Sequence, residues 1–438
     1  MLRLLAILFV ISIFIPAEFY LMLGSVRLEA YRLVLALTLL YVLLDIRRVL
    51  AMADVVDILL VALIGFVFAS FAYNHGLQKA VESTGIYAIE TLGAFYLARL
   101  YITTPERFFQ VNQWFITPLA LLTILTLYEA FSHHRILHDL ARFITGHEGL
   151  DARLYTNDYV RMGLLRATSL FEHPILYGTL MAMFFPFAVL MLWRYRQGTQ
   201  ALKVIGLSIS MLLTFSSAPL LSVIFQSFLT FLVRFWHSAK RFWVALFCGG
   251  LAISFLIETF SNRGFFGILI SYLTFNPNTG YFRLLQWQFT ADDIEQHLIL
   301  GIGHHDWTRP YWMDWMGNSI DSFWLLLILQ HGLFALLMLL LACFYASFNI
   351  LNLVHKHHAQ NRWMVTAWLL SFISLLFIGF TVDYFGKLQP VFFFILGAIN
   401  WAKYYPLWNQ QIINKIYNSE GENLDASAYP TPTPEDSL

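Results

Sequence analysis

The chain has 438 residues, of which 58% are apolar and 12% are charged, with 27 basic and 27 acidic side chains. Soluble domains carry about 25% charged residues, so this composition indicates a protein that is surrounded largely by lipid. The balanced charge gives no basic field that would favour nucleic acid as a partner. The two cysteines, Cys248 and Cys343, lie inside apolar runs and form neither a disulfide framework nor a metal-binding spacing. The predicted fold class is an all-α polytopic integral membrane protein.

Apolar runs recur along the whole chain, and a helix that crosses a bilayer needs about 20 mostly apolar residues. The first run is followed by others, so we expect it to be retained and not cleaved as a signal peptide. The break "TFSSAPLLS" (Thr214 to Ser222) is short, so residues 203–234 form either two spans or one kinked helix. The sequence predicts twelve transmembrane helices, at residues 2–16, 31–45, 57–74, 84–102, 113–131, 173–193, 203–217, 219–234, 242–259, 319–349, 363–382 and 389–407.

The distribution of Lys and Arg sets the orientation of these helices. With the N-terminus in the cytoplasm, the inward segments carry fifteen Lys and Arg and the short outward loops only four. The other eight lie in two long outward segments, which the positive-inside rule weights little. Both termini are therefore predicted to be cytoplasmic, and the acidic, proline-rich tail at 408–438 is predicted to be disordered.

Two long loops divide the chain into three helical parts, residues 1–131, 173–259 and 319–407. The loops span 132–172 and 260–318, both on the outer side, and both are rich in Phe, Tyr, Trp and Leu, which disfavours disorder. Their arginines suit an anionic, lipid-linked or sugar-bearing ligand, because the guanidinium fork binds phosphate. Contact with lipid headgroups is the alternative. The loop arginines are Arg135, Arg142, Arg153, Arg161, Arg166, Arg263, Arg283 and Arg309.

The first motif is "RATSLFEHPILYG", from Arg166 to Gly178, at the outer end of the sixth predicted span. Pro174 suits the first helical position and His173 the cap position. A helix N-terminus offers free N–H groups to an anion, so with Arg166 nearby a phosphate site is predicted. The alternative is that Glu172 and His173 only cap the helix.

The second motif is "YFRLLQWQF", from Tyr281 to Phe289. Arg283 and Trp287 are four residues apart and share one helical face, which predicts a short amphipathic helix at the membrane interface.

The third motif begins with "LILGIGHHDW", a Gly-x-Gly turn followed by His304 and His305. Asn318 or Ser319 is expected to cap the next helix and to place Asp321 in its first turn, where the helix dipole favours an acid. Adjacent histidines do not readily share one ion and no third ligand stands at a useful spacing, so no metal site is predicted.

In these three motifs the sequence resembles the O-antigen ligase/polymerase superfamily of bacterial inner-membrane glycosyltransferases. "RATSLFEHPILYG" is similar to the family's Arg-x-x-Gly-x-Phe-x-His/Asn-Pro element, and "YFRLLQW" with "HLILGIG" to its Arg-x-x-x-Trp and Gly-x-Gly elements. "NSIDSFWLLLILQHGLFALL" is similar to the element that supplies a catalytic His in ligases. Here that position is Ile320, with Asp321 beside it, and this version looks more like the polymerases.

The resemblance implies a GT-C-like fold with periplasmic loops and a polymerase of polyprenyl-diphosphate-linked oligosaccharides, such as undecaprenyl diphosphate repeat units, for O-antigen or exopolysaccharide. It implies no cofactor and no metal, and it suggests a chain-length regulator and a flippase of the same pathway as partners. Asp321, or one of His304 and His305, would be the base for the acceptor hydroxyl. Arg166, Arg283, Arg161 and His173 would bind the diphosphate, whose developing charge needs fixed positive groups.

Two other functions remain open. A ligase that transfers the glycan to lipid A core or to protein differs only in its acceptor. A secondary transporter or flippase is compatible with twelve spans, and Glu90, in the span segment "YAIETLGA", favours it because acids inside membranes are usually functional. The alternative for Glu90 is pairing with a neighbouring helix.

Overall fold

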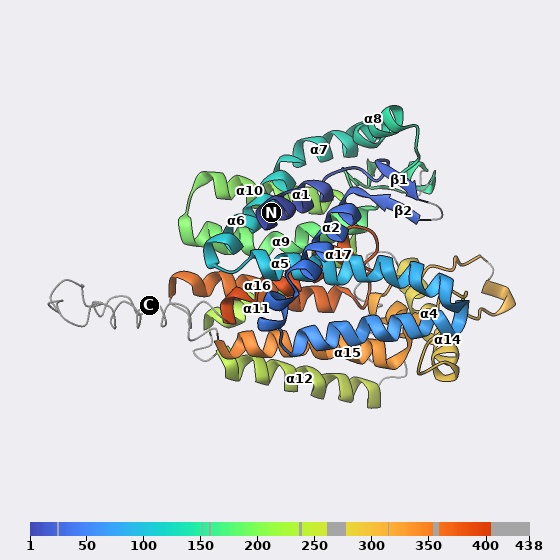
Figure 1. The fold of residues 1–438 in the computed structure, drawn as a ribbon. Helices are drawn as coiled ribbons and strands as arrows, with labels where there is room; N and C mark the ends of the chain where they lie inside the picture. The colour runs from blue at the N-terminus through green and yellow to red at the C-terminus, as the bar shows by residue number, and fades with distance from the viewer. Residues whose placement is uncertain are drawn as a thin grey trace, which may run out of the picture.

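The computed structural model describes residues 1–23, 26–150, 152–156, 159–235, 239–260, 277–313, 315–353 and 359–403, so the predicted disordered tail lies outside the described residues. The described chain is a helical bundle with two small antiparallel hairpins, β1 (Tyr20–Leu23) with β2 (Val26–Glu29) and β3 (Val160–Arg161) with β4 (Leu164–Leu165) (Figure 1). The all-α class is therefore confirmed apart from these short strands.

Most helices follow one another with short connections, apart from the two predicted loops and the hairpin that separates the first two helices. The N-terminal helices are α1 (Leu2–Ile13), α2 (Ala30–Leu44), α3 (Ile46–Ala51), α4 (Val55–Ala88), the π-helix η1 (Ile89–Gly93), α5 (Ala94–Tyr101), α6 (Pro105–Leu121) and α7 (Thr123–Ser132). The central helices are α8 (Ile136–Thr145), η2 (Ala152–Tyr155), α9 (Pro174–Tyr195), α10 (Gly198–Leu213), α11 (Ser217–Phe235) and α12 (Ala239–Phe260). The C-terminal helices are α14 (Pro277–Gln296), η4 (Tyr311–Met313), α15 (Phe323–Leu353), α16 (Ala359–Ile378) and α17 (Leu388–Ala398).

Several helices have the length and composition of membrane spans, which supports a multi-pass membrane protein. In the described parts of the chain, five segments qualify: Val55–Tyr101, Pro105–Ser132, Pro174–Tyr195, Phe323–Leu353 and Asn361–Ile378. The predicted count of twelve spans is not reproduced. Spans 57–74 and 84–102 fall in one segment, and other predicted spans fall on apolar helices shorter than a membrane-crossing helix needs. The shorter apolar helices are Leu2–Ile13, Ala30–Leu44, Gly198–Leu213, Ser217–Phe231 and Val244–Ile257.

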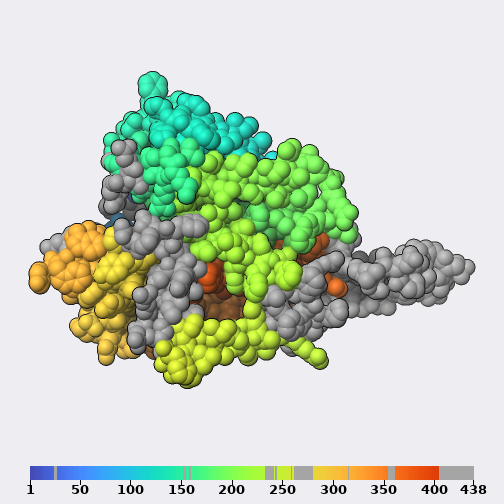
Figure 2. Space-filling model, turned by 180° about the vertical axis from the view of Figure 1, so that it is seen from behind, coloured from blue at the N-terminus to red at the C-terminus, as the bar shows by residue number. Residues whose placement is uncertain are grey.

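The region 203–234, for which the sequence leaves one or two spans open, contains two helices. α10 ends at Leu213 and α11 begins at Ser217. Phe215, between them, has a positive φ of 45°, which no continuing helix would allow. The face that carries α11 and α12, in green and yellow-green, is hollowed between these two helices, and orange segments are visible in the recess (Figure 2).

α4 turns back on itself at Gly76, whose φ of 81° and ψ of 168° lie outside the helical region. The rings of Phe71 and Tyr87 both approach the ring of His331, with centroid distances of 5.0 and 5.8 Å. An uninterrupted helix would hold residues 71 and 87 about 24 Å apart. The two arms therefore fold against each other, as the blue and light-blue arms at the α4 label show (Figure 1).

α15 is broken in the same way at Gly332, with φ 83° and ψ 176°. The backbone groups freed by the break bond to the Gly-x-Gly turn: Ile302 N donates to Leu329 O at 2.8 Å, and Leu333 N donates to Leu298 O at 2.8 Å. Both breaks occur in the same tripeptide, His-Gly-Leu, at 75–77 and at 331–333. The predicted turn in "LILGIGHHDW" is thus confirmed. It supplies hydrogen-bond partners to the backbone groups that the break in α15 leaves unpaired within the helix.

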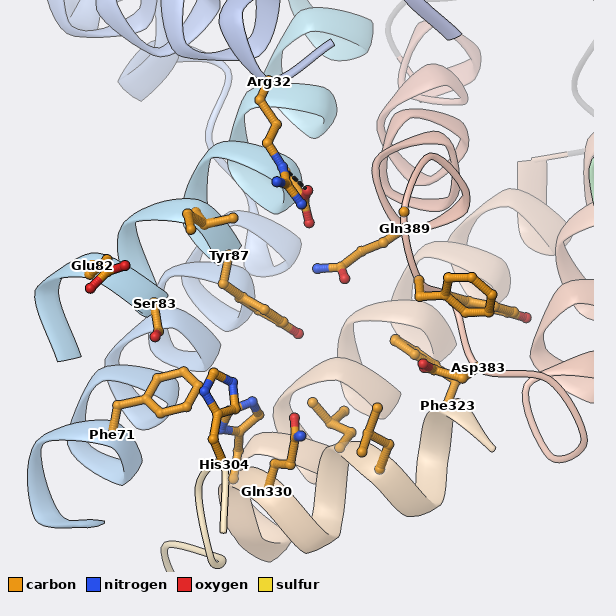
Figure 3. Close-up of a pocket in the computed structure, with 18 of the residues that line it drawn as sticks. Arg32, Phe71, Glu82, Ser83, Tyr87, His304, Phe323, Gln330, Asp383 and Gln389 are labelled. Atoms are coloured by element: carbon orange, nitrogen blue, oxygen red, sulfur yellow. Dashed lines mark hydrogen bonds and ion pairs between the residues drawn. The ribbon is translucent and has the colours of Figure 1, made fainter. Parts of the chain in front are cut away.

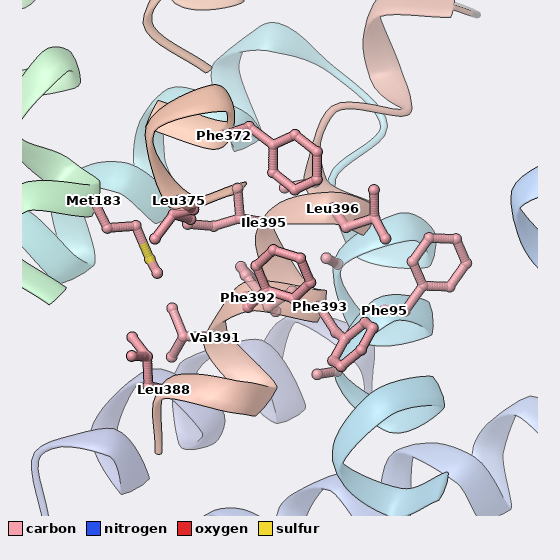
Figure 4. Packing of buried hydrophobic residues seen from close by; sticks show 14 of the residues in the cluster. Phe95, Met183, Phe372, Leu375, Leu388, Val391, Phe392, Phe393, Ile395 and Leu396 are labelled. Carbon is pink, nitrogen blue, oxygen red and sulfur yellow. The ribbon is translucent and has the colours of Figure 1, made fainter. Parts of the chain in front are cut away.

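The core is densest around α17, in which every residue but Gln389 is buried. Phe392 stacks on Phe372 with ring centroids 5.6 Å apart, among the apolar side chains of Figure 4. A Cβ at Gly397 would lie 2.3 Å from Phe95 O, so only glycine allows α17 to approach α5 this closely. This rigid centre fixes the segment 379–387 that precedes α17.

The outward segments of the prediction lie together at one end of the bundle. The ring of His147, in the first long loop, stacks on Tyr20 of β1 with centroids 4.4 Å apart, and His138 Nδ1 lies 2.9 Å from Glu18 Oε1. Ala167 N donates to Leu213 O at 3.0 Å, which joins the same loop to the end of α10. The strands β1 and β2 and the helix α14 mark this end, on the right in Figure 1.

Candidate functional site

A cavity of about 650 Å³ opens at this end of the bundle. It is lined by five of the predicted site residues, and we call it the arginine cavity. Each residue comes from a different place in the fold: β3, the segment after β4, the N-cap of α9, α14 and the segment before α15. The five residues are Arg161, Arg166, His173, Arg283 and Asp321.

Arg161 and Arg166 are held by the break between α10 and α11. Arg161 Nη1 donates to Phe215 O at 2.6 Å and Arg166 Nε donates to Thr214 O at 3.1 Å. Within the described residues, neither guanidinium forms an ion pair with an acidic side chain. Burial and the charge of Arg161 lower the pKa of Arg166 to about 9, so Arg166 stays charged at neutral pH. Two uncompensated cations side by side favour an anionic ligand.

A buried ion pair holds the backbone around Arg166. Glu129, in α7, accepts hydrogen bonds from Thr168 N at 3.0 Å and Ser169 N at 2.8 Å. Arg135 pairs with Glu129 and donates to Arg166 O at 3.2 Å. Arg135 is therefore a structural residue of the loop, and it does not line the arginine cavity.

Arg283 faces Asp321 across the cavity wall, with Nε 3.8 Å from Oδ2. The Arg283 side chain is 4% exposed, and its Nε and Nη1 atoms have no hydrogen-bond partner within the described residues. Asp321 is 42% exposed, toward the cavity that it lines. Burial lowers the pKa of Arg283, and the same desolvation raises the pKa of Asp321, with Arg283 offsetting part of it. An unmatched buried guanidinium facing a cavity is suited to a phosphate oxygen.

His173 caps α9, as the sequence predicts. α9 begins at Pro174, and His173 Nδ1 accepts a hydrogen bond from Ile175 N at 3.1 Å. The side chain satisfies one of the free N–H groups of the helix end, and the ring also lies on the cavity wall. His173 thus caps the helix and lines the site.

The predicted cap of the next helix at Asn318 or Ser319 is wrong, because α15 begins at Phe323. Gln286 of α14 accepts from Asp321 N at 3.1 Å and donates to Ser319 O at 2.8 Å, which keeps this segment extended. Ser322 takes the capping role, since Leu325 N donates to its hydroxyl at 3.3 Å. Asp321 therefore stands ahead of the helix, not in its first turn.

The two histidines of the third motif lie outside the arginine cavity. His304 N donates to His75 Nε2 at 2.7 Å, and the His304 ring packs on Phe71 with centroids 4.5 Å apart. Burial lowers the pKa of His304. The ring of His305 packs against that of His75 with centroids 4.4 Å apart and the planes tilted by 32°, and its side chain lines neither this cavity nor its neighbour. Of the three predicted bases, Asp321 is the one that lines the arginine cavity.

A second cavity of about 410 Å³ adjoins the first, and we call it the adjoining cavity. Arg27, Asp383 and Phe385 line both cavities. His304 lines the adjoining cavity, close to Phe71 in Figure 3.

Asp383 is the candidate residue that the sequence motifs do not reveal. It lies between α16 and α17, in "TVDYFGK", with no motif around it. Burial, with a smaller contribution from the negative charge of Asp321, raises the pKa of Asp383 to about 7. A carboxylate with a pKa near the working pH is suited to accept a proton.

Glu90 pairs with a neighbouring helix, which was one of the two interpretations of its position. Arg32 Nε, on α2, lies 2.8 Å from Glu90 Oε1, and the hydroxyl of Tyr31 donates to the same oxygen at 3.0 Å. The carboxylate is thereby neutralised inside the bundle.

Within the described residues, no three His, Cys, Asp or Glu side chains are grouped so that they could hold a metal ion. No protein-family model matches the sequence, and a search of the curated proteins finds no match.

Proposed function

We propose that the protein is a polymerase of polyprenyl-diphosphate-linked oligosaccharide repeat units, acting at the periplasmic face of a bacterial inner membrane. One observation carries the proposal: arginines from both long loops, Arg166 and Arg283, line a single cavity together with carboxyl side chains. Four carboxyl side chains line it: Glu29, Glu172, Asp321 and Asp383. A diphosphate leaving group needs fixed positive charge, and an acceptor hydroxyl needs a base. The cavity offers both.

In the proposed reaction a hydroxyl of the acceptor glycan attacks the anomeric carbon of the donor. A new glycosidic C–O bond forms, the bond from that carbon to the diphosphate oxygen breaks, and the hydroxyl proton passes to a carboxylate. Arg166 and Arg283 stabilise the charge that grows on the leaving diphosphate, assisted by Arg161 and by the α9 end at His173. No nucleotide is needed, because the energy arrives in the donor.

The fold supports the orientation that this chemistry requires. The cavity is built from segments that the Lys and Arg distribution assigns to the outer side. At the other end, segments assigned to the cytoplasm contact one another: Lys403 pairs with Asp54, and Tyr195 packs on Trp363 with ring centroids 6.2 Å apart. A donor flipped to the outer leaflet would therefore meet the arginines.

A transporter is the second candidate, and the observation that favours it is the pair of helices broken at Gly76 and Gly332. Discontinuous helices are typical of substrate sites in secondary transporters. Here, however, the carbonyls of Leu329 and Gln330 at the α15 break accept hydrogen bonds from Ile302 N and Gly303 N of the adjacent turn, at 2.8 and 2.9 Å. These two carbonyls are satisfied by the protein itself, which favours the enzyme.

The test is reconstitution of the purified protein with a polyprenyl-diphosphate oligosaccharide as the sole substrate. A ladder of product lengths supports the polymerase. Transfer only to added lipid A core means a ligase, and uptake into vesicles without a covalent product means a transporter. Either of the last two results overturns the proposal.

A further inference from the structure

The adjoining cavity holds three polar atoms that are buried and have no hydrogen-bond partner within the described residues: Tyr87 Oη, His331 Nδ1 and Gln389 Nε2. They come from three helices, α4, α15 and α17. Tyr87 and Gln389 extend toward each other across the cavity in Figure 3. Buried polar atoms nearly always have partners, so three orphaned groups around one space indicate a missing ligand.

The rest of the wall defines the chemistry of that ligand. Basic and acidic side chains on the wall are equal in number, with Arg27, Arg32 and Lys79 against Glu82, Glu90 and Asp383. Arg32 pairs with Glu90 at 2.8 Å and Lys79 with Glu82 at 3.6 Å, so the wall offers little net charge to an ionic ligand. The rings of Phe71 and Phe323 and the side chain of Gln330 also line this cavity. Uncharged donors and acceptors between aromatic faces are suited to a polyhydroxylated, uncharged molecule.

The two cavities share Asp383, whose carboxylate thus borders both the arginines and the orphaned groups. We propose that the adjoining cavity is the acceptor subsite, which binds the non-reducing end of an uncharged glycan and presents one hydroxyl at Asp383. This inference rests on the proposed function. It divides the site into a diphosphate side, at Arg161, Arg166 and Arg283, and a sugar side.

Dividing the site into these two sides indicates where the proton, the acceptor oxygen and the diphosphate go during the reaction. The acceptor hydroxyl loses its proton to Asp383 as its oxygen bonds to the anomeric carbon, which lies between the cavities. The diphosphate departs on the arginine side. Tyr87, His331 and Gln389 hold other hydroxyls of the acceptor, so they set its position and do not touch the bond that breaks.

The test uses two variants of the full chain, Tyr87→Phe and Gln389→Leu. Neither removes a hydrogen bond among the described residues, so both are expected to fold with unchanged thermal stability. The acceptor probe is the lipid-free oligosaccharide that mild acid releases from the polyprenyl-diphosphate pool of the producing cells. At saturating donor, each variant should raise the KM for this acceptor by about three- to tenfold and leave the KM for the donor unchanged.

Ser347→Ala is the matched control. Ser347 Oγ is also buried without a partner within the described residues, but it lies in the distal arm of α15 and lines neither cavity. Its acceptor KM should equal that of the wild type. An unchanged acceptor KM in both Tyr87→Phe and Gln389→Leu, with product still formed, overturns the acceptor subsite.

A binding measurement separates this inference from the proposed function. The lipid-free oligosaccharide should raise the unfolding temperature of the wild type, and at the same oligosaccharide concentration Gln389→Leu should show a smaller increase. If the wild type forms no product from any donor, the proposed function fails, and a retained, Gln389-dependent increase still supports a glycan site. No increase in the wild type overturns it.

Discussion

The guanidinium of Arg283 lies 3.8 Å from the carboxylate of Asp321, measured from Nε to Oδ2, and no hydrogen bond joins them. The separation exceeds hydrogen-bond range, although the Arg283 side chain is only 4% exposed. A buried cation held near, but not on, its counter-charge keeps its donors free for a ligand. Asp321 thus favours the charged form of Arg283 and orients its guanidinium, but it leaves the guanidinium N–H groups free to donate to a ligand.

Arg166→Ala and Arg283→Ala should each abolish polymer formation while the protein still accumulates in the membrane. Removing one donor that stabilises transition-state charge costs roughly 10²–10³-fold in kcat. Arg142→Ala is the matched control, because Arg142 is 48% exposed and pairs with Asp139 on the surface. Polymer should be measured in cells and in the reconstituted system. Polymer at the wild-type level from both cavity variants would rule out the diphosphate assignment.

Asp383→Asn and Asp321→Asn should distinguish the base from the residue that positions Arg283. If Asp383 is the base, kcat/KM of the wild type rises with pH and levels off above about 7, the pKa to which burial raises its carboxyl. Asp383→Asn should lose this dependence together with most of the activity. Asp321→Asn should keep the pH profile and raise the donor KM. The opposite pattern would assign the base to Asp321.

The same residue, Asp383, should also make the stability of the folded protein depend on pH. The folded-state pKa of Asp383 lies above its usual value of 3.8, so the folded protein binds a proton that the unfolded chain releases. The contribution of Asp383 to stability therefore falls as pH rises from about 4 to about 7. Asp383→Asn should raise the unfolding temperature relative to the wild type more at pH 8 than at pH 5. An equal effect at both pH values would contradict the raised pKa.

The apolar runs of the sequence predicted where helices occur, because burial in lipid or in the core needs the same composition. They did not predict helix ends or span lengths, which depend on tertiary contacts. Gln286 of α14, for example, holds the segment from Ser319 to Asp321 extended and delays α15 to Phe323. Nothing near Ser319 in the sequence indicates that contact.

Five of the seven predicted site residues line one cavity, and His304 and His305 do not, whereas Asp383 and the orphaned groups had no sequence signal. Asp383 is a single acid between two apolar helices, and its position depends on the packing of α17. Tyr87 and Gln389 are separated by most of the chain, and only the folding back of α4 brings Tyr87 to the cavity. A local sequence pattern cannot predict that two distant residues lie together when the contact depends on a turn of the chain at a glycine.

Gly76→Ala and Gly332→Ala should both destabilise the protein, and by different amounts. Each glycine has φ above 80°, so alanine at either position costs about 1–3 kcal/mol of backbone strain. At Gly76 no atom of the described parts of the chain lies within 4 Å of an added Cβ, whereas at Gly332 the Cβ would lie 2.1 Å from Ile299 O. Gly332→Ala should therefore lower the unfolding temperature in detergent much more than Gly76→Ala. Similar decreases would mean that α15 and the Gly-x-Gly turn separate at little cost.

Glu90 decides between the enzyme and the transporter. Its carboxylate binds Arg32 at 2.8 Å and Tyr31 at 3.0 Å, and the Glu90 side chain is 7% exposed. Glu90→Ala leaves the Arg32 charge buried without a counter-charge and should destabilise the protein by about 3–5 kcal/mol. The double variant Glu90→Ala with Arg32→Met should recover much of that loss and regain polymer formation, because the pair is structural. The measurements are the unfolding temperature and the polymer yield of the single and the double variant. A double variant that is stable and inactive would show that the pair has a functional role, either at the wall of the adjoining cavity or in moving charge across the membrane, as a transporter requires.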